Sequence, residues 1–337
     1  MCLKAMMMSQ YDNDIAVIIP FYNGSAYVRR AIDSVLTQSL SAAEFVIVND
    51  GSSEEETQFI DDLCRELGIR LVHQKNGGQA AARNTGVAST KASYICFLDQ
   101  DDFYLLHHNA VLRAAVPGAD ERFGWLYADL IISAEVGVEI MAGGIAEWTV
   151  HPKSSLKQLL AEDMYILPSA ALISRAAFEA VGGFDPQFMG YEDDDLFVRL
   201  FQAGFSNLFL PETVTVWNIN RASTSYSFRM TRSRMRYMLK LADAFPDNEA
   251  TGELYLSEYI APRFFKRILK DARHAQQPDH KFYPDRDEAF ATARQCVDAM
   301  LSSPAMARRL RRRIWWYWQR VRWERYGLWG ALSGRGD

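Results

Sequence analysis

The sequence predicts an α/β protein whose centre is a doubly wound, mainly parallel β-sheet. Between residues 15 and 99, four short runs rich in Ile and Val are separated by three amphipathic segments with apolar residues at helical spacing. A strand, a helix and a second strand in this order form a right-handed crossover, which makes the two strands parallel. The fourth run ends in a group of carboxylates, and open α/β folds bind their ligands at the carboxyl edge of the sheet.

The expected elements alternate regularly up to residue 99. Each expected strand is apolar along most of its length, as strands buried on both faces are, and each expected helix follows a turn that contains glycine. In the first expected helix, Ala31, Val35 and Leu36 have the spacing of a buried face. The expected strands are 15–20, 44–50, 69–73 and 94–99, and the expected helices are 26–38, 54–68 and 79–89.

After residue 102 the pattern is less regular. A strand is expected at 126–133, a helix at 154–163, a strand and a short helix within 168–185, and a helix with an acidic first turn at 190–205. From Arg221 the composition shifts toward long helical segments. We therefore predict a catalytic α/β domain at 11–220 and a mainly helical region at 221–337 that ends in a basic, aromatic tail.

Composition excludes several classes of protein. A net charge of −5 over 337 residues gives no general reason to expect nucleic acid as a partner. The four cysteines are far apart and form no C-x-x-C pair, so reduced thiols in a cytoplasmic protein are expected and cysteine-bound zinc is not. We find neither a signal-peptide pattern nor an apolar run of the roughly 18 residues that would span a membrane.

The run YICFLDQDD at 94–102 places Asp99, Asp101 and Asp102 directly after an apolar strand. Carboxylates this close repel one another unless a positive charge lies among them, and hard oxygen ligands suit Mg²⁺ or Mn²⁺. The sequence thus indicates a metal site at the end of this strand. A solvated acidic loop is the alternative reading.

A second acidic group, Glu192 to Asp195, follows a turn that ends at Gly190. Acidic residues in the first turn of a helix also stabilise its dipole, so part of this group can be structural. If both groups share one cleft, the first can hold a metal against a diphosphate leaving group. A carboxylate of the second can then take a proton from an incoming hydroxyl.

Five motifs in this order resemble a family 2 inverting glycosyltransferase with the GT-A fold. They are VIIPFYNGSAYVRRAIDSVLTQS, VIVNDGSS, NGGQAAARNTG, FLDQDD and GGFDPQFMGYEDDDLFVRLFQAGF, and together they span roughly residues 14 to 225. Each motif alone is weak, whereas their order and spacing are specific. The resemblance implies a hexosyltransferase-type enzyme that moves a single sugar from a nucleoside-diphosphate sugar to an acceptor hydroxyl in cell-surface polysaccharide or glycolipid assembly.

The resemblance also implies a nucleotide site. Pro20 and Tyr22 match residues that bracket the base, Asp50 matches the acid that reads it, and Arg83 and Asp99 match contacts to the nucleotide. A carboxylate that accepts from a ring N–H favours UDP or dTDP as the donor nucleotide. Structural roles remain open for three of them: a tyrosine packed on the sheet edge, an aspartate that forms a turn, and an arginine in a surface ion pair.

By the same resemblance Asp101 is the main ligand of Mg²⁺ or Mn²⁺, and Asp99 contacts the ribose or the metal. Asp193 falls at the general-base position, and Glu192 is its nearest substitute. The chain departs from the family at Asn220, where many relatives carry a histidine that helps to hold the metal. An amide oxygen is a weaker ligand for Mn²⁺, so metal affinity is expected to depend more on Asp101 and on phosphate oxygens.

Two other functions are compatible with parts of the pattern. A nucleotidyltransferase that makes sugar nucleotides uses a similar sheet and metal, but it needs a glycine-rich basic loop after the first strand, which PFYNGSAY does not supply. The other is a catalytically degenerate, membrane-associated scaffold. Retention of Asp99, Asp101 and Asp193 argues against a scaffold, and Asn220 argues slightly for it.

The C-terminal segment 306–330 combines many arginines with five tryptophans. Its apolar residues Leu310, Ile314, Tyr317, Trp318 and Val321 can share one helical face, with Arg308, Arg312 and Arg322 nearer the other. Arginine and tryptophan favour an anionic membrane surface, which predicts a peripheral position on the inner face of the membrane and a glycan or lipid-linked acceptor. The alternative is that the tryptophans pack on the protein.

Overall fold

The computed structural model describes residues 14–134, 140–142, 144–219 and 227–327. Contacts within the chain separate two units. One combines residues 1–154 with 164–223 and holds the β-sheet. The other combines residues 155–163 with 224–337 and is helical. The division predicted from the sequence, 11–220 and 221–337, differs in that residues 155–163 group with the helices.

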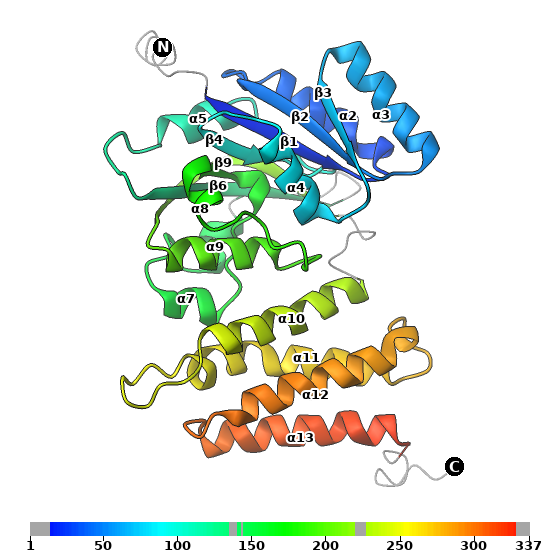
Figure 1. The fold of residues 1–337 in the computed structure, drawn as a ribbon, viewed down its shortest axis with the longest axis vertical. Helices are drawn as coiled ribbons and strands as arrows, with labels where there is room; N and C mark the ends of the chain where they lie inside the picture. Colours follow the sequence, from blue (N-terminus) through cyan, green and yellow to red (C-terminus); the bar gives the residue numbers. More distant parts are fainter. Residues whose placement is uncertain (1–13, 135–139, 143, 220–226, 328–337) are drawn as a thin grey trace. The chain divides into compact units, whose positions relative to one another are not determined.

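One mixed sheet organises the first unit (Figure 1). Its parallel half has the order β3-β2-β1-β4, and the order continues through β8, β6, β9 and β5. Strand β8 is antiparallel to both β4 and β6, whereas β6 and β9 are parallel to each other. The bounds in the parallel half are β1 Ile15–Phe21, β2 Glu44–Asp50, β3 Arg70–Gln74 and β4 Tyr94–Phe97.

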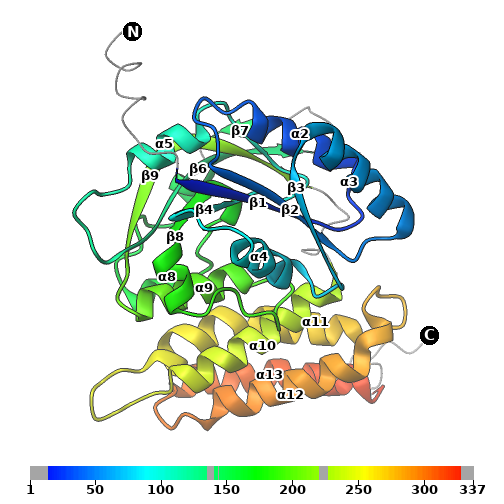
Figure 2. The ribbon, with the colours of Figure 1, turned by 45° about the horizontal axis from the view of Figure 1, so that its top comes forward.

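Helices cover both faces of the parallel half (Figure 2). They are α2 (Ser25–Leu36), α3 (Glu54–Leu67) and α4 (Gln79–Ala88). Ile15, Val17 and Ile19 face α2 and α3 in one apolar core, and successive side chains of a strand point to opposite faces. On the other face α4 packs tightly at Gly86, where an added Cβ would lie 2.3 Å from Ile18 Cγ2. The predicted doubly wound class is confirmed.

Local signals place the ends of these helices. Ser53 caps α3 by accepting a hydrogen bond from the Glu56 N–H, three acidic residues occupy the first turn, and the helix ends at Gly68 with a φ of 68°. Left-handed glycine is the common way to end a helix. Helix α2 ends earlier than expected, and the prediction that Leu36 is buried is wrong: its side chain is 47% exposed, while Ala31 and Val35 are buried.

In the second half of the sheet, β6 and β9 are longer than the strands of the parallel half. Strands β6 and β9 pair from Phe123 with Ser206 to Ala134 with Ile219, and β6 continues beyond its pairing with β8 at Tyr127 and Ala171. The long strand β9 was not predicted from the sequence. The elements of this half are β5 Phe103–Tyr104, α5 His108–Ala114, β6 Phe123–Ala134, β7 Ile140–Ala142, α6 Gly144–Trp148, η1 Pro168–Ala170, β8 Ala171–Ser174, α8 Arg175–Ala180, α9 Glu192–Gln202 and β9 Ser206–Ile219.

The helical unit is built around α11, which contacts α10, α12 and α13. Phe265, Ile268 and Leu269 of α11 are buried, and its Asp271 pairs with Arg234 of α10 at 2.6 Å. Within the described ranges, no helix combines the length and the apolar character needed to cross a bilayer. Its elements are α7 Leu156–Ala161, α10 Phe228–Ala244, η3 Leu256–Ile260, α11 Ala261–Ala275, η4 Tyr283–Asp285, α12 Arg286–Ser302 and α13 Arg308–Arg325.

Candidate active site at the carboxyl edge of the sheet

The first acidic group lies in a tight loop immediately after β4. Leu98 still donates to the Ile18 carbonyl at 3.0 Å, and the Asp102 N–H then closes a turn onto the Asp99 carbonyl at 3.0 Å. Because β1, β2 and β4 run parallel, the residues that follow each strand meet at one edge. The loop therefore lies at the edge where the sequence predicted the site.

Asp102 has a structural role in this loop. One of its oxygens accepts from the Ser169 hydroxyl at 2.9 Å, and the other accepts from the Asn218 N–H at 3.0 Å. Ser169 also accepts from the Asp99 N–H at 3.2 Å, and the Asn218 amide donates to the Asp101 carbonyl. Asp102 thus ties the loop to η1 and β9.

Asp101 is the acid that the loop leaves available. Among the described residues, the only hydrogen bond to its carboxylate comes from its own backbone, and Arg30 is the cation near enough to lower its pKa. Burial and the charge of Asp99 raise the pKa of Asp101 to about 6. The pKa of Asp102 is raised well above its ordinary value by burial and by both neighbouring aspartates. This concentration of negative charge favours binding of a cation.

Arg83 joins the two acidic groups. Its guanidinium is buried and donates to Asp99 at 2.6 Å and to Glu192 at 3.2 Å. The rings of Phe97 and Phe184 lie 5.8 Å and 5.2 Å from its centre. A buried arginine between two carboxylates fixes both of them, because removing either partner would leave a buried charge unpaired. The structure therefore brings the residues after β4 and the start of α9 together.

Within the second acidic group, Glu192, Asp193 and Asp195 have different partners. Glu192 uses one oxygen for Arg83 and the other for the Gly190 N–H at 2.7 Å. Asp195 pairs with Arg199 one turn later at 2.8 Å. Asp193 accepts only from the Asp194 N–H among the bonds described, at 2.9 Å. Burial and the charges of Glu192 and Asp194 raise the pKa of Asp193 well above its ordinary value, and Arg83 acts in the opposite direction.

Asp50 is committed to the loop that precedes α4. Its oxygens accept from the side chain of Gln74 at 2.6 Å and from the N–H groups of Gly77 and Gly78, each at 2.8 Å. A carboxylate offers about four acceptor positions, so about one is left for a ligand. The Asp50 side chain therefore fixes the loop expected to bind the nucleotide. A contact with the base would use its one remaining acceptor position.

Tyr22 and Pro20 differ in exposure. Tyr22 follows β1 and is 46% exposed, whereas Pro20 is buried inside β1 opposite Val48. The side chain of Gln100 holds the backbone of Tyr22, accepting from its N–H at 2.9 Å and donating to its carbonyl at 3.2 Å. Of the two residues expected to bracket a base, only Tyr22 presents a side chain to solvent.

Four residues that hold the site were not predicted. Gln79 donates to Asp99 at 2.6 Å, Gln100 binds Tyr22, and Ser169 and Asn218 hold Asp102. Gln79 opens α4 directly after two glycines, a signal that could have been used. The other three depend on pairings between distant segments, which no local pattern reports. Asn220, the departure from the family pattern, lies outside the described residues.

A divalent cation fits this arrangement if a ligand supplies most of its oxygens. In the parts of the chain that the structure describes, no group of three or more His, Cys, Asp or Glu side chains could hold a metal ion alone. Asp101 and the second oxygen of Asp99 accept no side-chain hydrogen bond there. One or two carboxylates with substrate phosphates are the usual surroundings of Mg²⁺.

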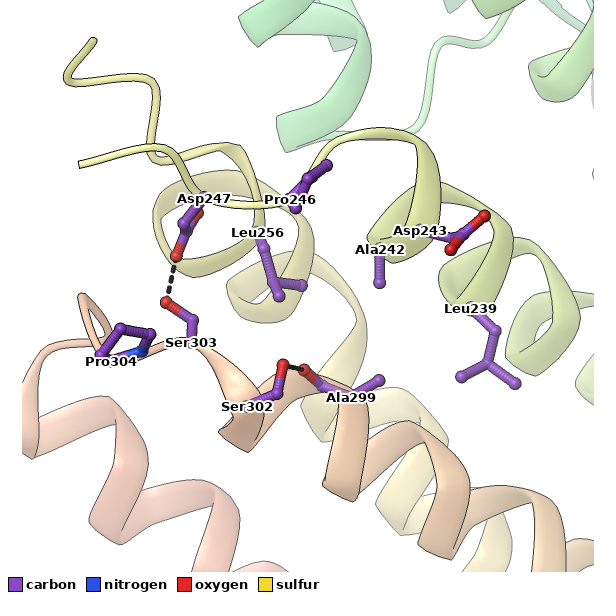
Figure 3. A pocket seen from close by; sticks show the side chains of 10 residues that line it. All are labelled: Leu239, Ala242, Asp243, Pro246, Asp247, Leu256, Ala299, Ser302, Ser303 and Pro304. Carbon is purple, nitrogen blue, oxygen red and sulfur yellow. Dashed lines mark hydrogen bonds between the residues drawn. The ribbon is translucent and has the colours of Figure 1, made fainter. Parts of the chain in front are cut away.

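A hollow of about 470 Å³ lies in the helical unit (Figure 3). None of the predicted site residues lines it. Its walls come from α10, η3 and α12 and the segments that follow α10 and α12, and they include Leu239, Leu256 and Asp247. Asp247 accepts from the Ser303 hydroxyl and from the Ser257 N–H, so its carboxylate is already bonded within the unit.

Two known protein families match segments of the chain that contain the predicted site residues. Residues 16–127 match the model of glycosyl transferase family 2, and residues 169–231 match a model described as the N-terminal domain of galactosyltransferase. The first match identifies residues 16–127, about a third of the chain, as a glycosyltransferase family 2 segment. The first match contains Asp50, Arg83 and Asp101, and the second contains Asp193. The predicted family is confirmed over residues 16–127, and the curated relatives that follow are named as glycosyltransferases.

Curated relatives cover only part of this chain. The uncharacterized glycosyltransferase EpsJ of Bacillus subtilis is 40% identical over 90 residues, which is 26% of each chain. The uncharacterized glycosyltransferase YibD of Escherichia coli is 35% identical over 96 residues, which is 28% of each chain. The chain thus spans about a quarter of the length of these relatives.

Solved structures share the fold at low sequence identity. TarS 1-349 of S. aureus, crystallised with UDP-GlcNAc, has a TM-score of 0.63 and 15% identity, covering 95% of this chain and 92% of that one. The mannosyltransferase PcManGT of Pyrobaculum calidifontis, in complex with GDP-Man and Mn²⁺, has a TM-score of 0.54 and 15% identity over 96% and 93%. The predicted GT-A fold is confirmed.

Proposed function

We propose that this protein transfers a single sugar from a nucleoside-diphosphate sugar to a hydroxyl group of an acceptor, with inversion at the anomeric carbon. The observation that carries the proposal is the bridge from Asp99 through Arg83 to Glu192. Asp101 and Asp193 are close neighbours in sequence of the two bridged acids. The two bridged groups therefore combine Asp101, an acid suited to a metal–diphosphate complex, with Asp193, an acid suited to proton removal.

The donor side uses the loop after β4. A Mg²⁺ or Mn²⁺ ion held by Asp101, with Asp99 beside it, would neutralise the charge that develops on the departing diphosphate. Asp102, Ser169 and Asn218 hold the loop that carries Asp101 in place, and Tyr22 offers a ring for the base. UDP or dTDP is the favoured nucleotide because Asp50 retains an acceptor position for a ring N–H. GDP-Man and UDP-GlcNAc are the ligands of the two structural neighbours.

The acceptor side uses Asp193 as general base. The acceptor oxygen forms a bond to the anomeric carbon, its proton moves to the Asp193 carboxylate, and the bond from the carbon to the diphosphate oxygen breaks. A raised pKa makes Asp193 a stronger base once it is ionised. Glu192 is a poor substitute, because Arg83 and the Gly190 N–H occupy its oxygens.

Release of nucleoside diphosphate tests the proposal. Wild-type protein with Mn²⁺ and a panel of UDP-, dTDP-, GDP- and CDP-sugars is expected to release one diphosphate slowly by hydrolysis without acceptor. Asp101→Asn is expected to abolish this release, and Asp62→Asn, an exposed substitution on α3, leaves it unchanged. If no nucleotide sugar is hydrolysed and no nucleotide raises the melting temperature, the chain is a scaffold instead. Formation of a sugar nucleotide from a sugar phosphate and a nucleoside triphosphate would identify a nucleotidyltransferase.

We further propose that the protein works on the cytoplasmic side of a membrane and that α13 binds anionic lipid. The inner side of α13 packs within the helical unit: Ile314 and Val321 are buried, and Trp318 lies 5.0 Å from Phe290 between ring centroids. On the outer side Trp315 and Trp316 are 52% and 49% exposed. The same side carries the exposed residues Arg308, Arg312 and Arg322.

The packed reading of the tail describes the inner side of this helix, and the proposed membrane contact would use its outer side. The segment Arg308–Arg325 contains eight arginines and one glutamate, so it attracts anionic lipid, and indole rings favour the headgroup region. An acceptor attached to a lipid would be met at this surface. Trp329 lies outside the described residues.

Flotation with vesicles of phosphatidylglycerol and phosphatidylcholine tests the membrane surface. Wild-type protein is expected to float with the anionic vesicles and not with pure phosphatidylcholine. The double variant Trp315→Ala/Trp316→Ala and the triple variant Arg308→Gln/Arg312→Gln/Arg322→Gln are expected to remain at the bottom, and Arg65→Gln on α3 is a matched control. Equal flotation of all variants would exclude this helix as the contact, and binding of duplex DNA without vesicle binding would show a nucleic-acid surface.

A further inference from the structure

Two exposed aromatic side chains form a pair in the unit that holds the β-sheet. Trp148 ends α6 and Tyr165 precedes η1, and their rings meet edge to face at 5.0 Å between centroids. Each side chain is 39% exposed. Both lie between the two segments that match family models, 16–127 and 169–231, so neither match accounts for them.

A small apolar cluster supports the pair. Leu130, Ile132, Ile145 and Ala170 are its buried members, and Leu167 packs against them. Ile145 lies on α6 with Trp148, and its N–H donates to Asp129 at 2.9 Å. At the start of α6, an added Cβ on Gly144 would lie 3.3 Å from Trp148 Cζ2. The indole therefore lies against the first residue of its own helix.

The same cluster adjoins the acidic loop. Its member Ala170 follows Ser169, the residue whose hydroxyl binds Asp102 and the Asp99 N–H. On the other side, Ser133 follows Ile132 and pairs with Asn218, which holds the loop at Asp101 and Asp102. The apolar cluster therefore connects the segments that carry the aromatic pair with the segments that hold the acidic loop.

Tyr165 adopts a backbone conformation that its residue type disfavours. Its φ is 53°, in the left-handed region, which costs a non-glycine residue about 1 kcal/mol or more. Residues in such conformations gather at functional sites, where the surrounding structure fixes them. The position of this ring is therefore maintained at the expense of local stability.

We infer that Trp148 and Tyr165 bind a sugar ring of the acceptor. A pyranose presents C–H groups on its faces and hydroxyls around its rim, so it can cover an aromatic side chain while its hydroxyls stay in water. The base of the donor has its own ring in Tyr22, on a different segment of the edge. The inference rests on the proposed function, and it makes the acceptor a carbohydrate rather than a protein or a bare lipid.

Saturation-transfer NMR measures this site directly. The probes are the methyl glycosides of glucose, galactose, mannose and N-acetylglucosamine at millimolar concentration, with the full chain and UDP present. Wild-type protein is expected to saturate the ring C–H protons of at least one glycoside. Trp148→Ala and Tyr165→Ala are expected to weaken binding about tenfold. Phe59→Ala on α3, a side chain with 37% exposure, is the matched control and keeps wild-type binding.

Nucleotide binding separates this inference from the proposed function. The melting-temperature shift with UDP and Mn²⁺ is expected to be the same in wild type, Trp148→Ala and Tyr165→Ala. Glycoside signals that survive in both variants, or no signal from any glycoside with the wild type, would overturn the sugar site and leave the donor chemistry standing. A wild-type dimer that Trp148→Ala dissociates would also overturn it, because a second copy of the chain would then cover the pair.

Discussion

Replacing Asp101 with asparagine is expected to stabilise the metal-free protein at neutral pH. The carboxylate lies among two other acids, and burial and Asp99 raise its pKa from 3.8 to about 6. In the unfolded chain it ionises near its ordinary value. Between these two values the native state holds a proton that the unfolded state has lost, so the wild type loses stability as pH rises through this range. Asparagine keeps a similar shape without the charge.

The size of the effect follows from the two pKa values. A pKa raised from 3.8 to about 6 corresponds to a cost of about 3 kcal/mol for ionised Asp101 above pH 6. We therefore expect Asp101→Asn to raise the free energy of unfolding by up to about 3 kcal/mol at pH 8. For a chain of this size that is on the order of 5 °C in melting temperature. At pH 4 the gain is expected to be small, because the native wild type is then protonated.

Thermal and urea unfolding with EDTA at pH 4, 6 and 8 measures this difference. Asp62→Asn on α3 is the control, because hydrogen bonds from Gln58 and Arg65 lower the pKa of Asp62, so no gain at high pH is expected there. Adding Mn²⁺ with UDP is expected to stabilise the wild type and not Asp101→Asn. A variant no more stable than the wild type at pH 8 would refute the view that ionised Asp101 destabilises the metal-free protein and favours binding of a cation.

Three further predictions concern the bridge, the base and the nucleotide loop. Arg83→Met leaves Asp99 and Glu192 unpaired and is expected to lower the free energy of unfolding by about 3 kcal/mol in urea; a loss below about 1 kcal/mol would contradict a buried bridge. Asp193→Asn is expected to reduce acceptor-dependent transfer at least about 100-fold with unchanged UDP affinity, and wild-type transfer should rise with pH as Asp193 ionises; full activity would exclude it as base. Asp50→Asn places an amide against the Gly77 and Gly78 N–H groups and is expected to cost about 1 to 3 kcal/mol of stability, with a reduced melting-temperature shift by UDP; an unchanged shift would separate Asp50 from the donor site.

The first half of the fold could be predicted because its signals are local. Runs of Ile and Val, glycine turns and helical spacing fix β1, β2 and α3 within a residue or two of their observed bounds. The second half depends on pairings between distant segments. The sequence of β9 mixes apolar and polar residues and has Pro211 and Glu212 in its middle, so the strand is defined by its pairing with β6 and β5. Leu36 has the spacing of a core residue, yet α2 ends there and leaves it exposed.

The sequence points to candidate site residues by their type and position, but it does not reveal the partners that distinguish one acid from the next. Four adjacent acids at 192–195 look alike in sequence, and each could be the base. The structure separates them by their partners: Arg83 and the Gly190 N–H take Glu192, and Arg199 takes Asp195. Three-dimensional pairing supplies this information, since Arg83 is 109 residues from Glu192 in the chain.

The distribution of partners also explains why the site contains more acids than the chemistry needs. Asp102 and Glu192 fix the positions of the two groups, the first through Ser169 and Asn218 and the second through Arg83. Asp101 and Asp193 lie next to these fixed residues, have few partners of their own, and have raised pKa values. In each pair, one acid is fixed by hydrogen bonds or an ion pair, and the other has few partners and stays available to react. Exchanging the members of a pair, as in Glu192→Asp with Asp193→Glu, should therefore disturb the site strongly. The two residues remain carboxylic acids, but neither is then the right length for its position.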